Sequence, residues 1–156
     1  AEKIPQAVFV FAGNGPQKEN IINKIQSMGI SDRIFMLGLR SDIPEILKSI
    51  DLFVLPTLQE ALGTSFLEAM AMGKPVIGTN VDGVGEVIEN GRNGYLVEPN
   101  NPSALAETII KALQDKEEAK AMGIEGRKMV RQNYTVEKMY KSMYALYSSL
   151  MEGERA

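Results

Sequence analysis

One stretch of the sequence decides the fold: Leu55-Pro56-Thr57-Leu58-Gln59-Glu60-Ala61-Leu62-Gly63-Thr64-Ser65-Phe66-Leu67-Glu68-Ala69-Met70. The apolar run that starts at Leu52 ends at Pro56, a short polar loop follows, and a helical pattern begins at about Ser65. Gly73-Lys74-Pro75 then ends that helix. This order is typical of a strand–loop–helix crossover in a parallel sheet of the α/β class.

Two carboxylates stand on either side of the expected helix start. Glu60 precedes Gly63, and Glu68 lies about one turn inside the helix. A helix N-terminus carries unpaired backbone N–H groups and a partial positive charge, which suit a phosphate, and a carboxylate beside it can accept hydrogen bonds from a diol. A second interpretation remains open, in which Ser65 and Glu68 form a capping box and Glu60 is a solvated loop acid.

Composition narrows the class of protein. A chain of 156 residues is long enough for one domain with a sizeable core. The absence of cysteine and histidine excludes disulfides and thiol chemistry and removes the usual general base and the commonest zinc ligand. A net charge of −3 without a basic run argues against a nucleic-acid partner. No apolar run approaches the ~20 residues of a membrane span, and the N-terminus lacks a signal-peptide pattern, so we expect a cytoplasmic location.

The rest of the chain alternates strands with helices. We expect strands at residues 8–12, 33–37, 52–55, 76–79 and 95–97. The strands at 8–12 and 76–79 are expected to be buried, because all of their residues are apolar except the glycine and the threonine that end the second one. Asn101 and Thr135 are expected to cap two of the later helices. The helix at 135–151 has apolar residues every three or four positions, which indicates an amphipathic stripe.

Several loops follow the expected strands. Gly13-Asn14-Gly15-Pro16 reads as a tight turn before a helix, because Lys18 stands where a dinucleotide fingerprint has its third glycine. Arg40 follows the second strand and is open to two interpretations, a solvated surface arginine or a contact to a base or phosphate. Asp82-Gly83-Val84-Gly85 offers further N–H groups at the same edge of the sheet. A triphosphatase loop is excluded, because Gly73-Lys74 is followed by Pro75 and lacks the upstream glycine.

Glu60 and Glu68 are separated by seven residues, and the segments around them form an ordered series. This series resembles the retaining GT-B glycosyltransferases of family 4, the glycosyl transferases of group 1, from about Val8 to Tyr134. The segments that carry the resemblance are Asp51-Leu52-Phe53-Val54-Leu55-Pro56, Glu68-Ala69-Met70-Ala71-Met72-Gly73-Lys74-Pro75-Val76-Ile77, Asp82-Gly83-Val84-Gly85-Glu86-Val87-Ile88 and Gly91-Arg92-Asn93-Gly94-Tyr95-Leu96-Val97.

The resemblance implies a fold and a site. The fold is a Rossmann-like parallel sheet of about five strands flanked by helices, a single donor-binding domain over residues 1–156. By similarity, Glu68 holds the ribose hydroxyls of a nucleotide-diphosphate sugar, and the catalytic Glu60 holds a sugar hydroxyl and stabilises positive charge on the sugar ring. The resemblance further implies that the backbone N–H groups of Leu62, Gly63, Thr64 and Ser65 face the distal phosphate or the sugar. Leu39 and Arg40 would lie beside the base, and the turn with Gly13 and Gly15 would lie near the phosphates.

The resemblance also implies parts that the chain lacks. In the family, a further strand and helix precede the strand that corresponds to Val8–Ala12, and they carry an arginine and a lysine that bind the donor phosphates. An acceptor-binding domain precedes that strand and helix. We therefore expect this chain to be the C-terminal half of a GT-B enzyme and to be inactive alone. We expect the full enzyme to act in glycan biosynthesis and to need no cofactor or metal ion. We expect Val8–Ala12 to pair directly with Leu52–Leu55, the other outcome being an exposed core groove. The 135–151 helix, left without an acceptor domain, would favour self-association.

Two alternatives accompany this interpretation. The chain could instead be a non-catalytic module that binds a nucleotide or another subunit, and the discriminator is whether an upstream segment restores sugar transfer. The full enzyme could also lie at the membrane surface rather than free in the cytoplasm, although no membrane span is expected.

Overall fold

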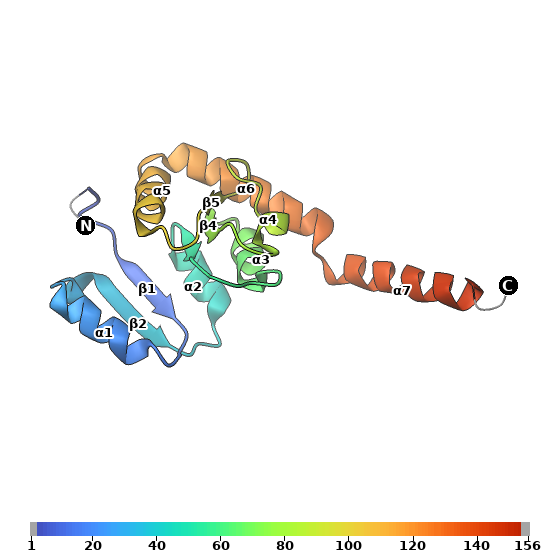
Figure 1. Cartoon of the computed structure of the whole chain (residues 1–156). Coiled ribbons are helices and arrows are strands. Elements are labelled where there is room, and N and C mark those ends of the chain that lie inside the picture. The colour runs from blue at the N-terminus through green and yellow to red at the C-terminus, as the bar shows by residue number, and fades with distance from the viewer. Residues whose placement is uncertain (1–2, 154–156) are drawn as a thin grey trace. The chain divides into compact units, whose positions relative to one another are not determined.

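The computed structural model describes residues 3–153, with side chains as far as Met151 (Figure 1). These residues form two compact units, of which the first ends at Ile46 and the second begins at Leu47. Each unit contains parallel strands joined by helical crossovers, so the predicted α/β class is confirmed. The single-domain organisation expected over residues 1–156 stays a prediction.

The first unit contains two parallel strands, β1 (Phe9–Ala12) and β2 (Ile34–Gly38). Helix α1 (Lys18–Ser27) and the short 3-10 helix η1 (Ser31–Arg33) form the crossover between them. The backbone N–H of Gly13 donates to the Gly38 carbonyl at 2.7 Å, which ties the loops after the two strands together. Helix α2 (Ile43–Ser49) runs across the boundary between the units.

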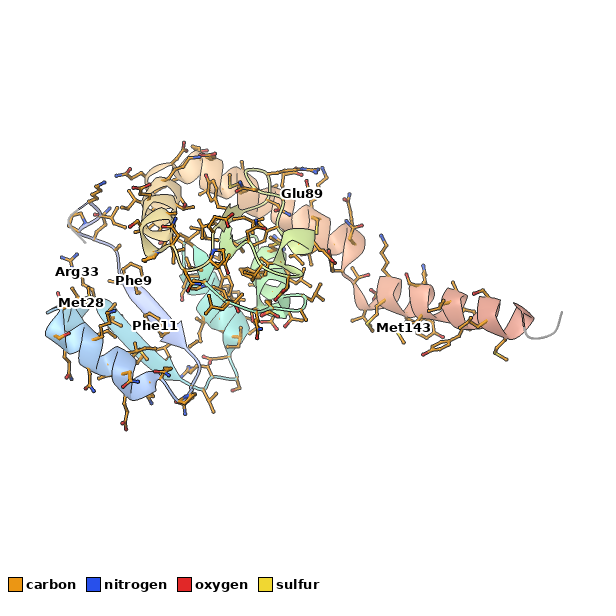
Figure 2. All side chains as sticks on the ribbon, in the orientation of Figure 1. Phe9, Phe11, Met28, Arg33, Glu89 and Met143 are labelled. Carbon is orange, nitrogen blue, oxygen red and sulfur yellow. The ribbon has the colours of Figure 1, made fainter. Side chains whose placement is uncertain are left out.

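Strand β1 differs from the prediction of a buried strand. Phe9 and Val10 are each 39% exposed, and Phe11 is 43% exposed; Figure 2 shows Phe9 and Phe11 on this strand. A two-stranded sheet beside one full helix has too few elements to cover both of its faces. The exposed core groove that we expected as the other outcome stays a prediction.

The second unit contains the parallel sheet β3-β4-β5. Its strands are β3 (Phe53–Leu55), β4 (Val76–Thr79) and β5 (Tyr95–Val97), and Leu55 lies opposite Gly78. Strand β4 is buried along its whole length, as predicted, and it lies between β3 and β5. The predicted pairing of Val8–Ala12 with Leu52–Leu55 would join the two units, and it stays a prediction. Among the described residues β1 pairs with β2 and β3 pairs with β4, so each pairing joins strands linked by one crossover.

Among the described residues, the second unit contains five helices beyond the end of α2: α3 (Thr64–Ala71), α4 (Val84–Val87), α5 (Pro102–Gln114), α6 (Lys116–Asn133) and α7 (Val136–Gly153). The predicted caps are confirmed. The Asn101 side chain accepts from Ala104 N at 3.0 Å, and the Thr135 hydroxyl accepts from Lys138 N at 3.2 Å.

Helix α3 is anchored in the core of the second unit. Phe66 and Met70 are fully buried, and burial of each such side chain contributes about 1.5–3 kcal/mol. The Phe66 ring meets the Phe53 ring of β3 edge to face at 5.6 Å. Helix α6 passes so close that a Cβ on Gly123 would lie 2.2 Å from the Gly73 carbonyl oxygen. These contacts hold α3 against β3 at one end and against α6 at the other.

Helix α7 carries an apolar surface that we name the α7 stripe: Val136, Met139, Tyr140, Met143, Tyr144, Tyr147, Leu150 and Met151. Every member is exposed, from 46% at Met143 to 73% at Val136, and Figure 2 labels Met143 on this helix. None of the helices described in the structure is long and apolar enough to cross a membrane.

Candidate functional site

The N-terminus of α3 is formed by Gly63, whose backbone is left-handed with φ 76° and ψ 57°. A Cβ at this position would approach the Phe66 ring to 2.6 Å, so glycine is required by both conformation and space. The helix begins at Thr64, with Gly63 as its N-cap and no side-chain capping bond. The capping-box interpretation of Ser65 and Glu68 is therefore wrong, because Ser65 lies inside the helix and Glu68 lies beyond its third residue.

Glu60 is held against this helix start. Its side chain is half-buried, and Oε1 accepts a hydrogen bond of 3.0 Å from the backbone N–H of Gly63. The partial positive charge of the helix N-terminus favours a carboxylate in this position. The structure thus places the predicted catalytic acid at the mouth of the predicted site.

The first turn of α3 offers further donors. Within the described part of the chain, the backbone N–H groups of Leu62, Thr64 and Ser65 donate to no other residue. All three residues are exposed. With Gly63 N already bonded to Glu60, three of the four predicted N–H groups stay available for an anion.

Glu68 lies one turn further along the same helix, four residues after Thr64. Its side chain is exposed, and it forms no hydrogen bond or ion pair with another described residue. A carboxylate without a protein partner at this position is available to accept hydrogen bonds from a ligand.

The loop after β4 contributes two residues whose role the sequence did not reveal. Asp82 Oδ2 accepts from the backbone N–H of Glu60 at 3.2 Å, and the N–H of Gly83 donates to the Glu60 carbonyl at 3.2 Å. The Thr79 hydroxyl also donates to the Thr57 carbonyl. The available signal was the position of Asp82-Gly83 at the carboxyl end of the neighbouring strand, which we interpreted as a source of N–H groups for a ligand.

The other predicted donor-binding residues belong to the first unit. Gly13 and Gly15 form the turn after β1, and a Cβ on either would meet no atom within 4 Å. The 2.7 Å bond from Gly13 N to Gly38 O brings this turn to the segment that precedes Leu39, which is 80% exposed. Gly13, Gly15, Leu39 and Arg40 therefore gather at the carboxyl ends of β1 and β2. Their part in donor binding stays a prediction.

Arg40 forms a bidentate ion pair that neither interpretation foresaw. Its Nε and Nη2 donate to the two carboxylate oxygens of Asp42 at 2.8 and 2.6 Å. This hydrogen bonding raises the pKa of the Arg40 guanidinium and lowers the pKa of the Asp42 carboxyl. A contact between Arg40 and a phosphate would compete with Asp42.

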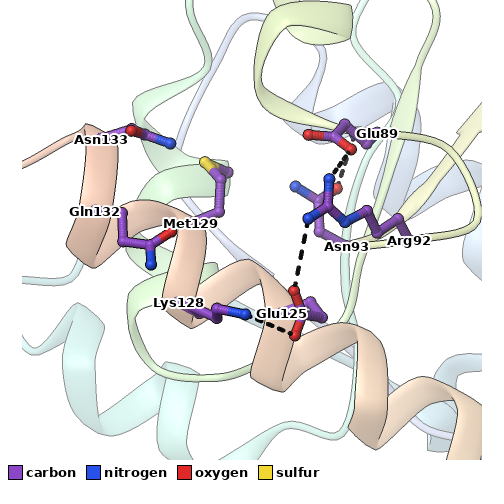
Figure 3. A pocket seen from close by; sticks show the side chains of 8 residues that line it. All are labelled: Glu89, Arg92, Asn93, Glu125, Lys128, Met129, Gln132 and Asn133. Carbon is purple, nitrogen blue, oxygen red and sulfur yellow. Dashed lines mark hydrogen bonds and ion pairs between the residues drawn. The ribbon is translucent and has the colours of Figure 1, made fainter.

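A polar cleft of about 340 Å³ lies elsewhere in the second unit, between the segment after α4 and helix α6 (Figure 3). Arg92 pairs with Glu89 at 2.6 Å and with Glu125 at 3.9 Å, and Lys128 pairs with Glu125 at 3.6 Å. Two acids and two bases balance each other here, so the cleft has no net charge to attract a nucleotide diphosphate. Its remaining lining residues are polar or flexible: Asn93, Met129, Gln132 and Asn133. Residues 3–153 also contain no group of three or more acidic residues placed to hold a metal ion.

The fold and the α3 site define a parallel α/β domain whose open helix N-terminus lies beside two carboxylates. The family model described as "Glycosyl transferases group 1" matches residues 1–129. The chain belongs to this family.

Individual relatives and solved structures agree with the family model. The chain is 33% identical over 149 residues to the N-acetyl-alpha-D-glucosaminyl L-malate synthase of Bacillus anthracis, with 96% of this chain and 39% of that protein covered. It is 36% identical over 114 residues to the UDP-Gal:alpha-D-GlcNAc-diphosphoundecaprenol alpha-1,3-galactosyltransferase of Escherichia coli, with 72% and 30% covered. The chain thus spans about two fifths or less of the length of these relatives.

Among solved structures, HepE of Anabaena in complex with UDP matches with a TM-score of 0.89 and 26% identity. The match covers 93% of this chain and 42% of that chain. A C-terminal domain of a group 1 glycosyl transferase from Francisella tularensis (LpcC) matches with a TM-score of 0.74 and 21% identity over 83% of this chain and 86% of that one, a likeness of fold alone. The predicted assignment to a GT-B glycosyltransferase domain is confirmed.

Proposed function

We propose that this chain binds the nucleotide-diphosphate-sugar donor of a retaining glycosyltransferase. The observation that carries the proposal is the arrangement at α3. A half-buried Glu60 and an unpaired, exposed Glu68 flank a helix N-terminus whose Leu62, Thr64 and Ser65 N–H groups are unused. Carboxylates suit the hydroxyls of a ribose and a sugar, and the N–H groups suit a phosphate between them.

Each group has a proposed role. Glu68 accepts hydrogen bonds from the ribose hydroxyls, and the first turn of α3 holds the distal phosphate and its developing charge. Glu60 accepts a sugar hydroxyl and stabilises the positive charge of a transition state that resembles an oxocarbenium ion, as in glycoside hydrolysis. We propose that these groups act without a metal ion.

The similarity to HepE, solved in complex with UDP and with UDP-glucose, supports this class of ligand. Because the chain spans 42% of HepE and 39% of the N-acetyl-alpha-D-glucosaminyl L-malate synthase, we propose that transfer needs protein groups beyond these residues and that the isolated chain is inactive. A cytoplasmic location and a role in glycan biosynthesis stay predictions.

A thermal-shift titration of this chain with UDP, GDP, ADP and NAD tests the ligand class. A ligand at tenfold excess over its Kd adds about 1.4 kcal/mol to the free energy of unfolding, which is measurable. A shift with one nucleotide diphosphate and not with NAD is expected, and it would identify the base. A shift with NAD alone, or with none of the four, would contradict donor binding by these residues.

A kinetic test separates the two glutamates. In the full-length enzyme, Glu60→Gln is expected to lower kcat by more than it weakens donor binding, because the charge of Glu60 acts mainly on the transition state. Single-turnover kinetics and donor titration measure the two effects. A loss of donor affinity with kcat unchanged would assign Glu60 to binding alone and contradict its catalytic role.

We also propose that the α7 stripe mediates self-association of the isolated chain. Its eight apolar side chains are all at least 46% exposed, and exposed apolar surfaces of this kind favour contact between copies.

A further inference from the structure

The loop between β4 and α4 holds the peptide backbone of Glu60 at two points. Asp82 Oδ2 accepts from Glu60 N, and Gly83 N donates to Glu60 O, both at 3.2 Å. The two residues lie 22 and 23 positions beyond Glu60 in the chain. They meet it because β3 and β4 are parallel neighbours, with Leu55 opposite Gly78, so the loops after the two strands lie at one edge of the sheet.

Asp82 has an uncommon backbone conformation, and Gly83 is crowded by the loop that carries Glu60. Asp82 has φ 38°, a left-handed conformation that is uncommon for a residue with a side chain and is tolerated best by asparagine and aspartate. Gly83 passes so close to the other loop that a Cβ would lie 1.9 Å from the Ala61 carbonyl oxygen. A backbone strained at one residue and crowded at the next is maintained where the surrounding structure requires it.

The contact reaches the α3 site through Glu60. The carboxylate of Glu60 accepts a hydrogen bond from Gly63 N at 3.0 Å. The backbone N–H and the backbone carbonyl of Glu60 are both hydrogen-bonded to the Asp82-Gly83 segment. Asp82 thus connects the backbone of the site acid to the neighbouring strand, whereas Gly63 connects its side chain to the helix.

We propose that Asp82 is a positioning residue for Glu60. Its carboxylate fixes the Glu60 peptide so that the Glu60 side chain stays at the N-terminus of α3, aimed at the sugar of the donor. The proposal rests on the proposed donor site and assigns to Asp82 no contact with the donor itself.

Substitutions at Asp82 can separate positioning from stability. Asp82→Asn keeps an acceptor oxygen and a residue type that tolerates the left-handed backbone. Asp82→Gly removes the acceptor but relieves the backbone strain, so it isolates the loss of the hydrogen bond. Asp115→Ala is the matched control, because it removes another aspartate bond to a backbone N–H, the 3.0 Å bond to Glu118 N at the start of α6.

Two readouts are needed. The first is hydrogen exchange of the Glu60 amide by NMR in the ligand-free chain. The second is calorimetric affinity for UDP-glucose, GDP-mannose and ADP-glucose, each compared with its nucleotide diphosphate. The ratio of the two affinities reports the contact with the sugar, whereas the nucleotide affinity reports the rest of the site.

We expect Asp82→Gly to speed exchange of the Glu60 amide at least tenfold and to abolish the preference for the sugar nucleotide, with nucleotide affinity within twofold. Asp82→Asn should restore both, and Asp115→Ala should change neither. Wild-type exchange and preference in Asp82→Gly, or equal defects in Asp82→Asn and Asp82→Gly, would overturn the proposal. If no sugar nucleotide binds the wild type, the donor site itself fails, and unchanged exchange at Glu60 would still refute positioning.

Discussion

The carboxylate of Glu60 accepts a hydrogen bond of 3.0 Å from the backbone N–H of Gly63, three residues further along the chain. This bond exists because Gly63 turns the backbone into the left-handed region immediately before α3. The acid therefore takes one of the N–H groups that a phosphate could use and leaves the next ones open. A sugar hydroxyl bound to the same carboxylate would lie beside a phosphate on the first turn of the helix.

Substitution of Gly63 by alanine should destabilise the chain strongly. The left-handed backbone costs about 1–2 kcal/mol for a residue with a Cβ, and a Cβ at 2.6 Å from the Phe66 ring adds about 1–3 kcal/mol of overpacking. Urea unfolding measures the loss.

Gly91→Ala is the matched control for this substitution. Gly91 has φ 80°, but a Cβ there would meet no atom within 4 Å, so only the cost of the backbone conformation, about 1–2 kcal/mol, is expected. Equal losses in the two variants would show that the contact with Phe66 does not constrain Gly63.

The local order of the α3 site was predictable from the sequence. The apolar run before Pro56, Gly63 and the later Gly73-Lys74-Pro75 are local signals, and they located β3 and α3 to within a residue or two. Two interpretations at the helix start could not be separated by spacing alone, because the position of the N-cap decides between them. The structure places that cap at Gly63.

Contacts between distant segments were not predictable in the same way. The bond from Glu60 N to Asp82 spans 22 positions and depends on the pairing of β3 with β4. Strand β1 pairs with β2 in its own unit, and its apolar pattern did not specify this neighbour. Its exposure follows from the small number of elements in the first unit, which the alternation of strands and helices does not reveal.

The Arg40–Asp42 pair leads to a prediction about pH. Hydrogen bonding to Arg40 lowers the pKa of Asp42 in the folded chain. The pair therefore stabilises the fold fully at a pH above the pKa of an aspartate in the unfolded chain, which is about 3.9. That stabilisation is lost as the pH falls through the lowered folded pKa. A ¹³C NMR titration should give a midpoint for Asp42 below the ordinary value, and Arg40→Gln should raise it. An identical midpoint in the variant would contradict the pairing in solution.

The same titration tests the predicted contact of Arg40 with a phosphate. If Arg40 leaves Asp42 to bind the donor, saturating nucleotide diphosphate should raise the Asp42 pKa towards its ordinary value. An unchanged midpoint in a chain that binds the nucleotide would show that the assignment of Arg40 to the donor site is wrong.

The α7 stripe leads to a prediction about association. Light scattering at increasing concentration should show a species larger than the monomer, because the stripe is apolar and exposed along the whole helix. Met143→Glu should reduce the association by placing a charge on the stripe. Ala145→Glu introduces the same charge outside the stripe and should have little effect. A wild-type chain that remains monomeric at high concentration would refute the prediction.

The most direct test of the donor site is a calorimetric comparison of wild type and Glu68→Ala. The ligand is the nucleotide diphosphate that stabilises the chain most, and Glu107→Ala, another exposed helical glutamate, is the control. Because Glu68 has no partner among the described residues, the free energy of unfolding should change by no more than about 0.5 kcal/mol. Affinity should fall by about 1–3 kcal/mol, the scale of lost hydrogen bonds to a charged group. Equal affinities for wild type, Glu68→Ala and Glu107→Ala would contradict the assignment of Glu68 to the nucleotide.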